Sequence, residues 1–275
     1  MTATTQAVIL ARGLGTRMQR DDDSRESAAL TAEQRASAAA GQKGMMNVGR
    51  PFIEYVVSSL ADAGITRVIL VVAPGPNPLR EHFTATAPPR RVTVAFAEQL
   101  EPRGTADALY AARDAVDRGA FLMLNSDNLY PTKACHRLAA IGGNGLVAFE
   151  ADSLVREGGI AAEKVLRFAL VDIGPDDTMH TIVEKPAPDH PLARRTERWV
   201  SMNLWSFTDV IFSACRSVTP SARGELELVD AVRIAKDEMG ATFHVIRERA
   251  GVLDLSARAD VGAVAQRLRG VTPRP

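Results

Sequence analysis

The chain has 275 residues, of which 46% are hydrophobic and 24% are charged, close to the averages of globular proteins. Its 33 basic residues balance its 33 acidic residues, which argues against a chain-wide electrostatic surface for nucleic acid or an anionic membrane. No apolar run reaches the ~18 residues of a membrane helix, and Cys135 and Cys215 form neither a disulfide framework nor a CxxC metal clip. We therefore expect a soluble, cytoplasmic protein with no nucleic-acid partner and no membrane partner.

The first half of the chain alternates predicted strands and helices. A buried strand over 6–11 leads into a glycine-bearing turn. An alanine-dense stretch over 28–40 predicts a short helix, because Thr31 and Gln34 fit a capping box and Gly41 fits the position after a helix end. Further helices are expected over 52–63, near 77–83 and over 105–117, with strands over 67–73, 91–96 and 120–124. This alternation predicts βαβ units and a mostly parallel, doubly wound sheet.

The second half of the chain is less regular. Strands are expected over 146–149, 165–172, 181–184 and 198–207, without regular helices between them. Helices are expected near 209–215, 226–239 and 257–268, and the proline-rich segment 186–191 is expected to be a loop. The predicted fold class is α/β, a Rossmann-like doubly wound mixed sheet with an integrated α+β portion.

A glycine-rich turn at the end of the first strand, Gly13-Leu-Gly15-Thr16-Arg17, is the clearest candidate for ligand binding. In an open α/β sheet, ligands gather at the carboxyl ends of strands, where a glycine turn lets backbone N–H groups approach phosphate. The dinucleotide fingerprint needs a third glycine where Met18 stands, and no Lys-Ser or Lys-Thr completes a P-loop. The turn is then either a plain tight turn or a phosphate site with Arg17 as a fixed cation.

Six ordered segments together resemble the sugar-phosphate nucleotidyltransferases, which make nucleoside-diphosphate sugars from a nucleoside triphosphate and a sugar 1-phosphate. These segments are Val8 to Met18, Lys43 to Tyr55, Gln99 to Leu109, Asn125 to Asn128, Glu184 to Pro186, and Gly251 to Leu255. The resemblance covers nearly the whole chain. It implies one nucleotidyltransferase domain over 1–275, with a nucleotide-binding half at about 1–130 and a sugar-phosphate-binding half at about 131–275.

The resemblance also implies a reaction, in which a sugar-phosphate oxygen attacks the α-phosphorus in line and pyrophosphate leaves. Because the attacking group is already an anion, catalysis would rest on positioning and on charge neutralisation. The cations implied for this catalysis are Arg17, Lys43 and Lys185. Asp127 and Asp254 would hold Mg2+, which prefers a few carboxylates with phosphate oxygens and water. A turn-forming role for Asp127 and a helix N-cap role for Asp254 are the alternatives.

Binding residues follow from the same resemblance. Nucleotide contacts are implied for Ala11, Gly13, Gly15, Thr16, Gln99, Gly104 and Thr105, and acceptor contacts for Asn125, Glu184, Lys185, Asn203 and Glu225. The Gln99 amide can offer a pyrimidine edge one donor and one acceptor, a pairing that cannot choose uracil from thymine. Strand alternation predicts that only one of Glu184 and Lys185 faces the cleft unless Pro186 bends the chain, and a surface ion pair is the alternative.

The sequence departs from the family pattern at several places. Arg12 stands where the family usually carries a small residue, so it either turns away from the nucleotide or adds a phosphate contact, and Asn47 replaces a common proline. The interval between Arg17 and Lys43 is long, and we interpret the insertion at about 20–41 as a lid helix, or equally as a surface or subunit contact.

Two other functions stay open at this point. One is transfer to a non-sugar phosphate acceptor such as phosphocholine, and the other is a catalytically inactive regulatory homologue that still binds nucleotide. Homo-oligomers are frequent in the resembling family, so a second copy of the chain is an expected partner.

Overall fold

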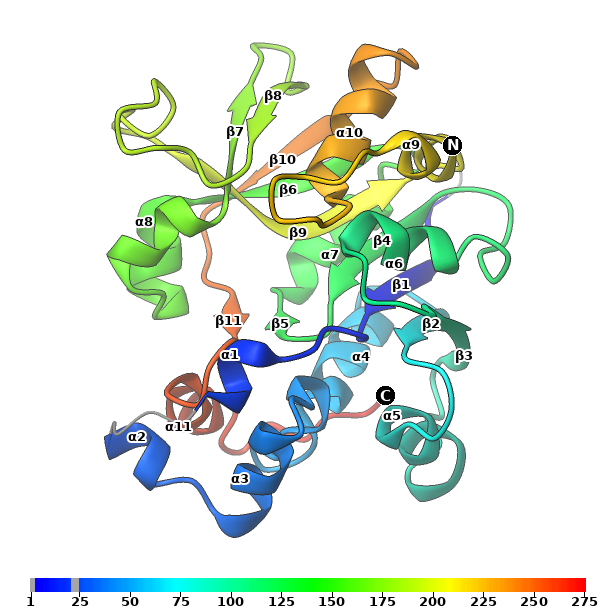
Figure 1. The fold of residues 1–275 in the computed structure, drawn as a ribbon, viewed down its shortest axis with the longest axis vertical. Helices are drawn as coiled ribbons and strands as arrows, with labels where there is room; N and C mark the ends of the chain where they lie inside the picture. The colour runs from blue at the N-terminus through cyan, green and yellow to red at the C-terminus, as the bar shows by residue number, and fades with distance from the viewer. Residues whose placement is uncertain (1–2, 21–24) are drawn as a thin grey trace.

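The computed structural model describes residues 3–20 and 25–275 (Figure 1). Its strands are β1 (Gln6–Leu10), β2 (Arg67–Val72), β3 (Thr93–Glu98), β4 (Phe121–Asn125), β5 (Asn128–Leu129), β6 (Gly145–Glu150), β7 (Ala169–Ile173), β8 (Met179–Val183), β9 (Trp199–Phe207), β10 (His244–Glu248) and β11 (Leu253–Asp254).

The helices surround this set of strands. The α-helices are α1 (Thr16–Gln19), α2 (Arg25–Ala28), α3 (Ala32–Ala39), α4 (Phe52–Asp62), α5 (Pro78–Glu81), α6 (Thr105–Ala111), α7 (Thr132–Ala139), α8 (Ala151–Ser153), α9 (Val210–Ser217), α10 (Leu228–Asp237) and α11 (Asp260–Arg267). Short 3₁₀ segments are η1 (Lys43–Met45) and η4 (Ala162–Arg167), and π-helical turns are η2 (His82–Thr86) and η3 (Leu154–Gly158). No helix in the described residues is long and apolar enough to cross a bilayer.

One mixed sheet organises the molecule, with its main strands in the order β10-β6-β9-β4-β1-β2-β3. Strands β3, β2, β1 and β4 are parallel neighbours, whereas β9 runs antiparallel to both β4 and β6. The β7–β8 hairpin joins β9 and stands at the far end of the molecule from β2 and β3 (Figure 1). The predicted α/β fold class is therefore confirmed, and the β7–β8–β9 region is the α+β portion.

Both faces of this sheet are covered. Along β1, Ala7 and Ile9 face one apolar cluster and Val8 and Leu10 face another, as the alternation of side chains in a strand requires. Helices α4, α7 and α11 contribute to the first cluster, and α6, α9 and α10 contribute to the second. Because both faces are buried, the strand ends are left as the place for a ligand, and the carboxyl ends of β1, β2 and β4 lie together.

Two expected elements differ from the structure. The helix expected over 105–117 ends at Ala111, after which turns lead to β4. The strand expected over 165–172 begins only at Ala169, because the residues before it form the 3₁₀ segment η4.

One α-helix and one strand of five or more residues, α7 and β10, were missing from the predictions, as were several shorter helices and strands. Helix α7 buries Ala134, Cys135, Leu138 and Ala139, and this spacing of one face was a readable helical signal. Strand β10 was harder to predict, because only two of its five residues are buried. It lies parallel to β6 and closes that side of the sheet.

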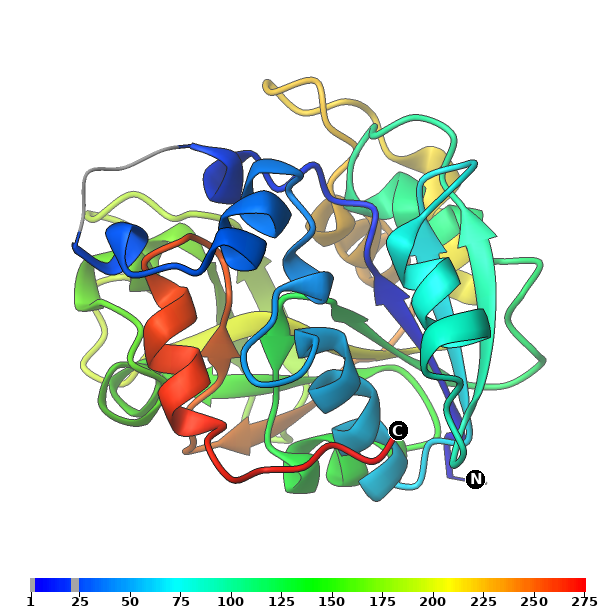
Figure 2. The ribbon, with the colours of Figure 1, turned by 90° about the horizontal axis from the view of Figure 1, so that it is seen from below.

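The insertion packs against the segments that flank it and against a helix near the C-terminus. Helix α3 begins with the expected capping box of Thr31 and Gln34. It contacts α1 and η1, and α2 contacts α11 near the C-terminus (Figures 1 and 2). The acidic run Asp21 to Asp23 lies outside the described residues. The described part of the insertion therefore bridges the glycine turn and the C-terminal helix.

The end of the insertion meets the glycine turn at a contact between two backbones. Gly15 has φ 63°, and a Cβ there would lie 2.3 Å from the carbonyl oxygen of Gly41. Gly41 has φ 68°, and a Cβ on it would lie 2.3 Å from the carbonyl oxygen of Leu14. Neither position has room for a side chain, and both conformations favour glycine.

We predict that Gly15→Ala and Gly41→Ala each lower the free energy of unfolding by about 1–3 kcal/mol, because strain at positive φ adds to a backbone clash. Urea unfolding followed by circular dichroism measures this loss. Gly13→Ala is the matched control, since a Cβ on Gly13 would have no heavy atom within 4 Å. Equal stability of all three variants would contradict the contact.

Candidate active site

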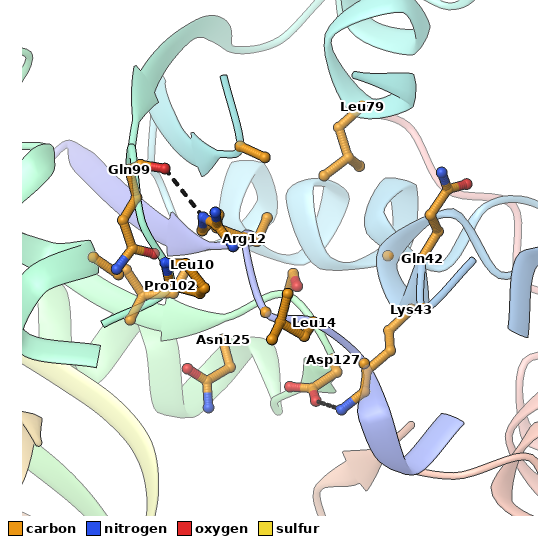
Figure 3. Close-up of a pocket in the computed structure, with 18 of the residues that line it drawn as sticks. Leu10, Arg12, Leu14, Gln42, Lys43, Leu79, Gln99, Pro102, Asn125 and Asp127 are labelled. Carbon is orange, nitrogen blue, oxygen red and sulfur yellow. Dashed lines mark hydrogen bonds and ion pairs between the residues drawn. The ribbon is translucent and has the colours of Figure 1, made fainter. Parts of the chain in front are cut away.

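A cavity of about 630 Å3 opens at the carboxyl ends of the parallel strands (Figure 3). The glycine turn after β1, the end of the insertion, the loop after β3 and the end of β4 form its walls. This volume lies within the usual range of small-molecule sites. The cavity therefore has the size and the position that a nucleotide needs in an α/β sheet.

Eleven of the predicted site residues line this cavity. They are Ala11, Gly13, Gly15, Thr16, Lys43, Gln99, Gly104, Thr105, Asn125, Asp127 and Glu225. The predicted residues outside its lining are Arg17, Glu184, Lys185, Asn203 and Asp254. The structure thus gathers the predicted nucleotide contacts in one place, whereas most of the predicted acceptor contacts lie beyond this cavity.

Lys43 and Asp127 form an ion pair at one wall of the cavity. The Lys43 Nζ atom lies 2.8 Å from Asp127 Oδ2, and the two side chains are 16% and 17% exposed (Figure 3). Lys43 begins η1 directly after the insertion, and Asp127 lies in the turn between β4 and β5. A fixed cation and a carboxylate are therefore held together beside the glycine turn.

Asp254 reaches the same region through a two-residue ladder, in which β11 pairs antiparallel with β5. Its Oδ1 accepts hydrogen bonds from Asn128 Nδ2 at 3.1 Å and Ser256 Oγ at 2.6 Å. Asp260, and not Asp254, accepts from the backbone N–H groups of Ser256 and Ala257 before α11. The N-cap alternative for Asp254 is therefore wrong.

The two aspartates act on each other electrostatically. Burial and, second, the negative charge of Asp127 together raise the pKa of Asp254 to about 6. In the described part of the chain, no group of three or more His, Cys, Asp and Glu side chains is arranged to hold a metal ion. Two repelling carboxylates fit a divalent cation such as Mg2+, which takes its remaining oxygen ligands from phosphate and water.

Arg17 lies on α1, which starts at Gly15, and its side chain is exposed. A buried arginine that the sequence analysis did not single out holds the end of this helix. Arg258, only 7% exposed, donates from Nε to the carbonyl oxygen of Met18 at 2.9 Å and from Nη2 to that of Gln19 at 3.2 Å. Since Arg258 follows β11 closely, it connects the segment of Asp254 to the helix that carries Arg17.

The loop after β3 is fixed by several contacts. Arg12 donates from Nε to the carbonyl oxygen of Gln99 at 3.0 Å and from Nη2 to that of Leu100 at 3.3 Å (Figure 3). The sequence left two roles open for Arg12, which were to turn away from the nucleotide or to add a phosphate contact. The structure shows its side chain turned to this loop. Gly104 has φ 124°, and a Cβ there would lie 2.4 Å from the carbonyl oxygen of Leu226. The Thr105 hydroxyl accepts from the N–H of Leu228 at 2.9 Å.

Glu184 and Lys185 follow β8, which ends at Val183. Lys185 has φ 44°, and its Nζ lies 3.6 Å from Glu184 Oε1. Both residues lie beyond the end of the strand, and their ion pair is the alternative that the sequence left open. Burial raises the pKa of Glu184, the charge of Glu227 acts in the same direction, and Lys185 and Arg223 oppose them.

Asn203 lies at an irregularity of β9. Between the pairs Ala148–Ser201 and Leu146–Trp205 the register of β6 and β9 shifts, and Asn203 has φ 60° there. Its Oδ1 accepts a hydrogen bond of 3.5 Å from the indole nitrogen of Trp205. Asn203 is the one residue of β9 that is not buried, although the alternation of the strand continues on both sides of it.

A family comparison decides the assignment, because the model of the family described as Nucleotidyl transferase matches residues 37–267. The chain belongs to the nucleotidyl transferase family. The resemblance noted from the six sequence segments is thereby confirmed at the level of the family.

Relatives and solved structures agree with this membership. The UTP–glucose-1-phosphate uridylyltransferase AglF of Haloferax volcanii is 28% identical over 97% of this chain and 98% of that protein. The low-salt glycan biosynthesis nucleotidyltransferase Agl11 of the same organism is 24% identical to this chain. The alignment covers 72% of this chain and 52% of Agl11.

Two solved structures share the fold of this nucleotidyl transferase. A UTP-bound UGPase from Acinetobacter baumannii aligns with a TM-score of 0.74 at 19% identity, covering 98% of this chain and 95% of that chain. The inositol-1-phosphate CTP transferase from T. maritima aligns with a TM-score of 0.71 at 18% identity, covering 98% of each chain. At such identities these likenesses establish the architecture alone.

We predict that Arg258→Ala loosens the glycine turn, because the carbonyl groups at the end of α1 lose their buried donor, at a cost of about 1–3 kcal/mol. Hydrogen–deuterium exchange should rise over residues 15–20, together with a lower Tm. Arg269→Ala, on an exposed side chain, is the control. Unchanged exchange over 15–20 in Arg258→Ala would remove the positioning role.

Proposed function

We propose that this protein transfers a nucleotidyl group from a nucleoside triphosphate to a sugar 1-phosphate, giving a nucleoside-diphosphate sugar and pyrophosphate. The observation that carries this function is one cavity in which the glycine turn, Lys43 and Asp127 meet the loop of Gln99. AglF, which aligns over almost its full length, supports a sugar phosphate as the acceptor.

The phosphate end of the nucleotide would lie on the glycine turn. Backbone N–H groups of Gly13 to Thr16 donate to phosphate oxygens, and the open space beside Gly13 allows a close approach. Lys43 exchanges its partner Asp127 for a phosphate oxygen, and Arg17 supplies a second positive charge from α1. Ala11 and Thr16 shape the turn at its two ends.

Asp127 and Asp254 are the residues that would hold Mg2+. A bound magnesium ion supplies neutralisation of phosphate charge, which favours attack at the α-phosphorus. The chain's own part is to fix the two carboxylates at the paired strands β5 and β11, with Asp127 in the turn just before β5 and Asp254 on β11.

The acceptor would bind between the nucleotide cavity and the β7–β8–β9 region. Asn125 and Glu225 line the cavity on this side, and we assign Lys185 to the phosphate of the acceptor. Glu184 and Asn203 are assigned to its hydroxyl groups. The left-handed conformations of Lys185 and Asn203 support this assignment, because strained polar residues of this kind cluster at functional sites.

We also propose a role for the insertion as a wall of the triphosphate site. Its last residues, Ala40 and Gly41, line the cavity, and Gln34 Nε2 donates to the carbonyl oxygen of Asn47 at 2.7 Å. We place the enzyme in the cytoplasm, where nucleoside triphosphates occur and where its buried free cysteines stay reduced. Homo-oligomerisation stays a prediction.

The proposed function predicts pyrophosphate release that requires both a nucleoside triphosphate and a sugar 1-phosphate. A coupled phosphate assay with magnesium, a panel of triphosphates and a panel of acceptors measures it. The acceptor panel includes inositol 1-phosphate and phosphocholine. Release with one of these alone would move the acceptor class away from sugars, and tight triphosphate binding without any release would favour a regulatory homologue.

In the same assay we expect Asp127→Asn to lower kcat by at least about 100-fold with its fold unchanged, because a carboxylate of the proposed metal site is lost. Circular dichroism checks the fold. The control is Asp114→Asn, on an exposed aspartate away from the cavity. Near-normal turnover of Asp127→Asn would refute the metal assignment.

The raised pKa of Asp254 predicts a gain in stability when this charge is removed. Since the pKa in the folded protein exceeds that of a free aspartate, the carboxylate destabilises the fold increasingly as pH rises from about 4 to about 6, and fully above that. Asp254→Asn should therefore raise the free energy of unfolding at pH 8, without divalent cations, by about 1–2 kcal/mol, allowing for solvent screening.

Urea midpoints at pH 5 and pH 8 measure this difference. The gain should shrink at the lower pH, because Asp254 is then largely protonated in the folded protein. Asp114→Asn should give no such pH-dependent gain. A loss of stability of Asp254→Asn at pH 8 would show that the hydrogen bonds of Asp254 outweigh its repulsion with Asp127.

A further inference from the structure

The Gln99 side chain is held in a defined orientation at the wall of the nucleotide cavity. It is only 4% exposed, and its Nε2 donates to the carbonyl oxygen of Gly104 at 3.1 Å and to Asp107 Oδ2 at 2.8 Å. Both partners are acceptors, so the amide nitrogen, and not the oxygen, must face them. Both hydrogens of the amide are therefore used within the protein.

This arrangement leaves the Oε1 atom of Gln99 for a ligand. No described residue donates to it, it is not among the buried atoms without a partner, and Gln99 lines the cavity. A base in this cavity therefore meets an acceptor at Gln99. The amide does not offer one donor and one acceptor, as its chemistry alone would allow.

Asp107 is itself fixed on the first turn of α6. Its Oδ1 accepts from Arg103 Nη2 at 2.8 Å while Oδ2 accepts from Gln99, and its side chain is 14% exposed. The first turn of a helix also favours a negative charge. The carboxylate thus keeps both oxygens as acceptors, with one committed to Gln99.

The backbone of Gln99 is held as firmly as its side chain. Its N–H donates to the carbonyl oxygen of Val72 at 3.0 Å, and its carbonyl oxygen accepts from Arg12 Nε at 3.0 Å. Figure 3 shows Arg12 beside this carbonyl group at the edge of the cavity. Rotation of the side chain amide is then the one simple way to change what Gln99 presents to a base, and Asp107 opposes it.

We propose that Asp107 is a positioning residue for base selection, which fixes the Gln99 amide so that the site accepts uracil or thymine and rejects cytosine. The imide N3 of uracil and thymine carries a hydrogen that can donate to Gln99 Oε1. The N3 of cytosine carries a lone pair, so two acceptors would face each other there. This proposal rests on the proposed function and specifies the nucleotide of that same site.

The magnitude follows from the cost of an unmade hydrogen bond at a buried group, which is roughly 10- to 100-fold in affinity. A purely structural Asp107 would behave differently. If it served only as the partner of Arg103 and as a helix-start carboxylate, its loss would weaken every nucleotide alike. The ratio between UTP and CTP therefore separates a positioning role from a structural one.

The experiment compares UTP, dTTP, CTP and ATP in wild type, Asp107→Ala and Arg103→Ala. Wild type should favour UTP or dTTP over CTP by roughly 10- to 100-fold in kcat/KM. Asp107→Ala should reduce that preference at least several-fold, because only the carbonyl oxygen of Gly104 then opposes rotation of the Gln99 amide. Arg103→Ala should keep the wild-type ratio, since it removes the other partner of Asp107 and leaves the bond to Gln99 in place.

A ratio measured on one preparation does not depend on the fraction of folded protein, so partial misfolding of Asp107→Ala does not obscure the result. A preference for CTP or ATP in wild type, or the same UTP to CTP ratio in Asp107→Ala, overturns the proposal. Either result leaves the proposed nucleotidyl transfer intact.

Isothermal titration calorimetry with UTP and CTP, in the absence of any acceptor, tests the role of Asp107 separately from the proposed nucleotidyl transfer. It reports base selection even if no acceptor is turned over. A UTP preference in binding that falls in Asp107→Ala supports the role of Asp107 when the proposed function fails. Absence of binding for every triphosphate overturns both.

Discussion

The two-residue ladder between β5 and β11 is the constraint on which the candidate active site depends. It pairs Asn128 with Asp254 and so joins the end of β4 to a segment more than a hundred residues later. Two carboxylates that repel each other lie at this junction, and the surrounding sheet, with apolar clusters on both faces, holds them there. The fold thus holds together two carboxylates that would move apart if their segments were free.

From this junction two further connections run to the rest of the site. Through Lys43, Asp127 contacts the end of the insertion, and through Arg258 the segment after Asp254 contacts the end of α1. The cations and the carboxylates of the site are therefore positioned by one connected set of contacts. This explains how residues from four distant parts of the chain reach one edge of the sheet.

Eleven of the residues that line the cavity could be predicted through the resemblance to a known family, whereas the glycine turn and the strand-final carboxylate alone left alternatives open. Gln99 was predicted as a base contact, but the sequence could not tell which side of its amide faces the ligand, since this depends on Asp107 and Gly104. The direction of Arg12 likewise depends on carbonyl groups that lie 87 and 88 residues away in the chain. Periodicity carries no information on such contacts.

Two backbone conformations near the site could not be predicted from sequence periodicity. Lys185 and Asn203 have positive φ, which is uncommon for residues other than glycine and which a strand pattern does not foresee. Helix α7 is a different case. The apolar spacing that predicts it was present in the sequence but was not used. The tertiary contacts, and not the local sequence, settle where the acceptor-side residues point.

The contact between Gly15 and Gly41 has a consequence for how this enzyme can diverge. Of the eight residues of α3, one, Ala38, is buried, so the helix presents few side chains that its surroundings must match. Gly41, by contrast, fits against the glycine turn without space for a single added carbon. Changes in the length and composition of the insertion are thus tolerated in its outer part, whereas its final residue is bound to the phosphate turn and can change only together with it.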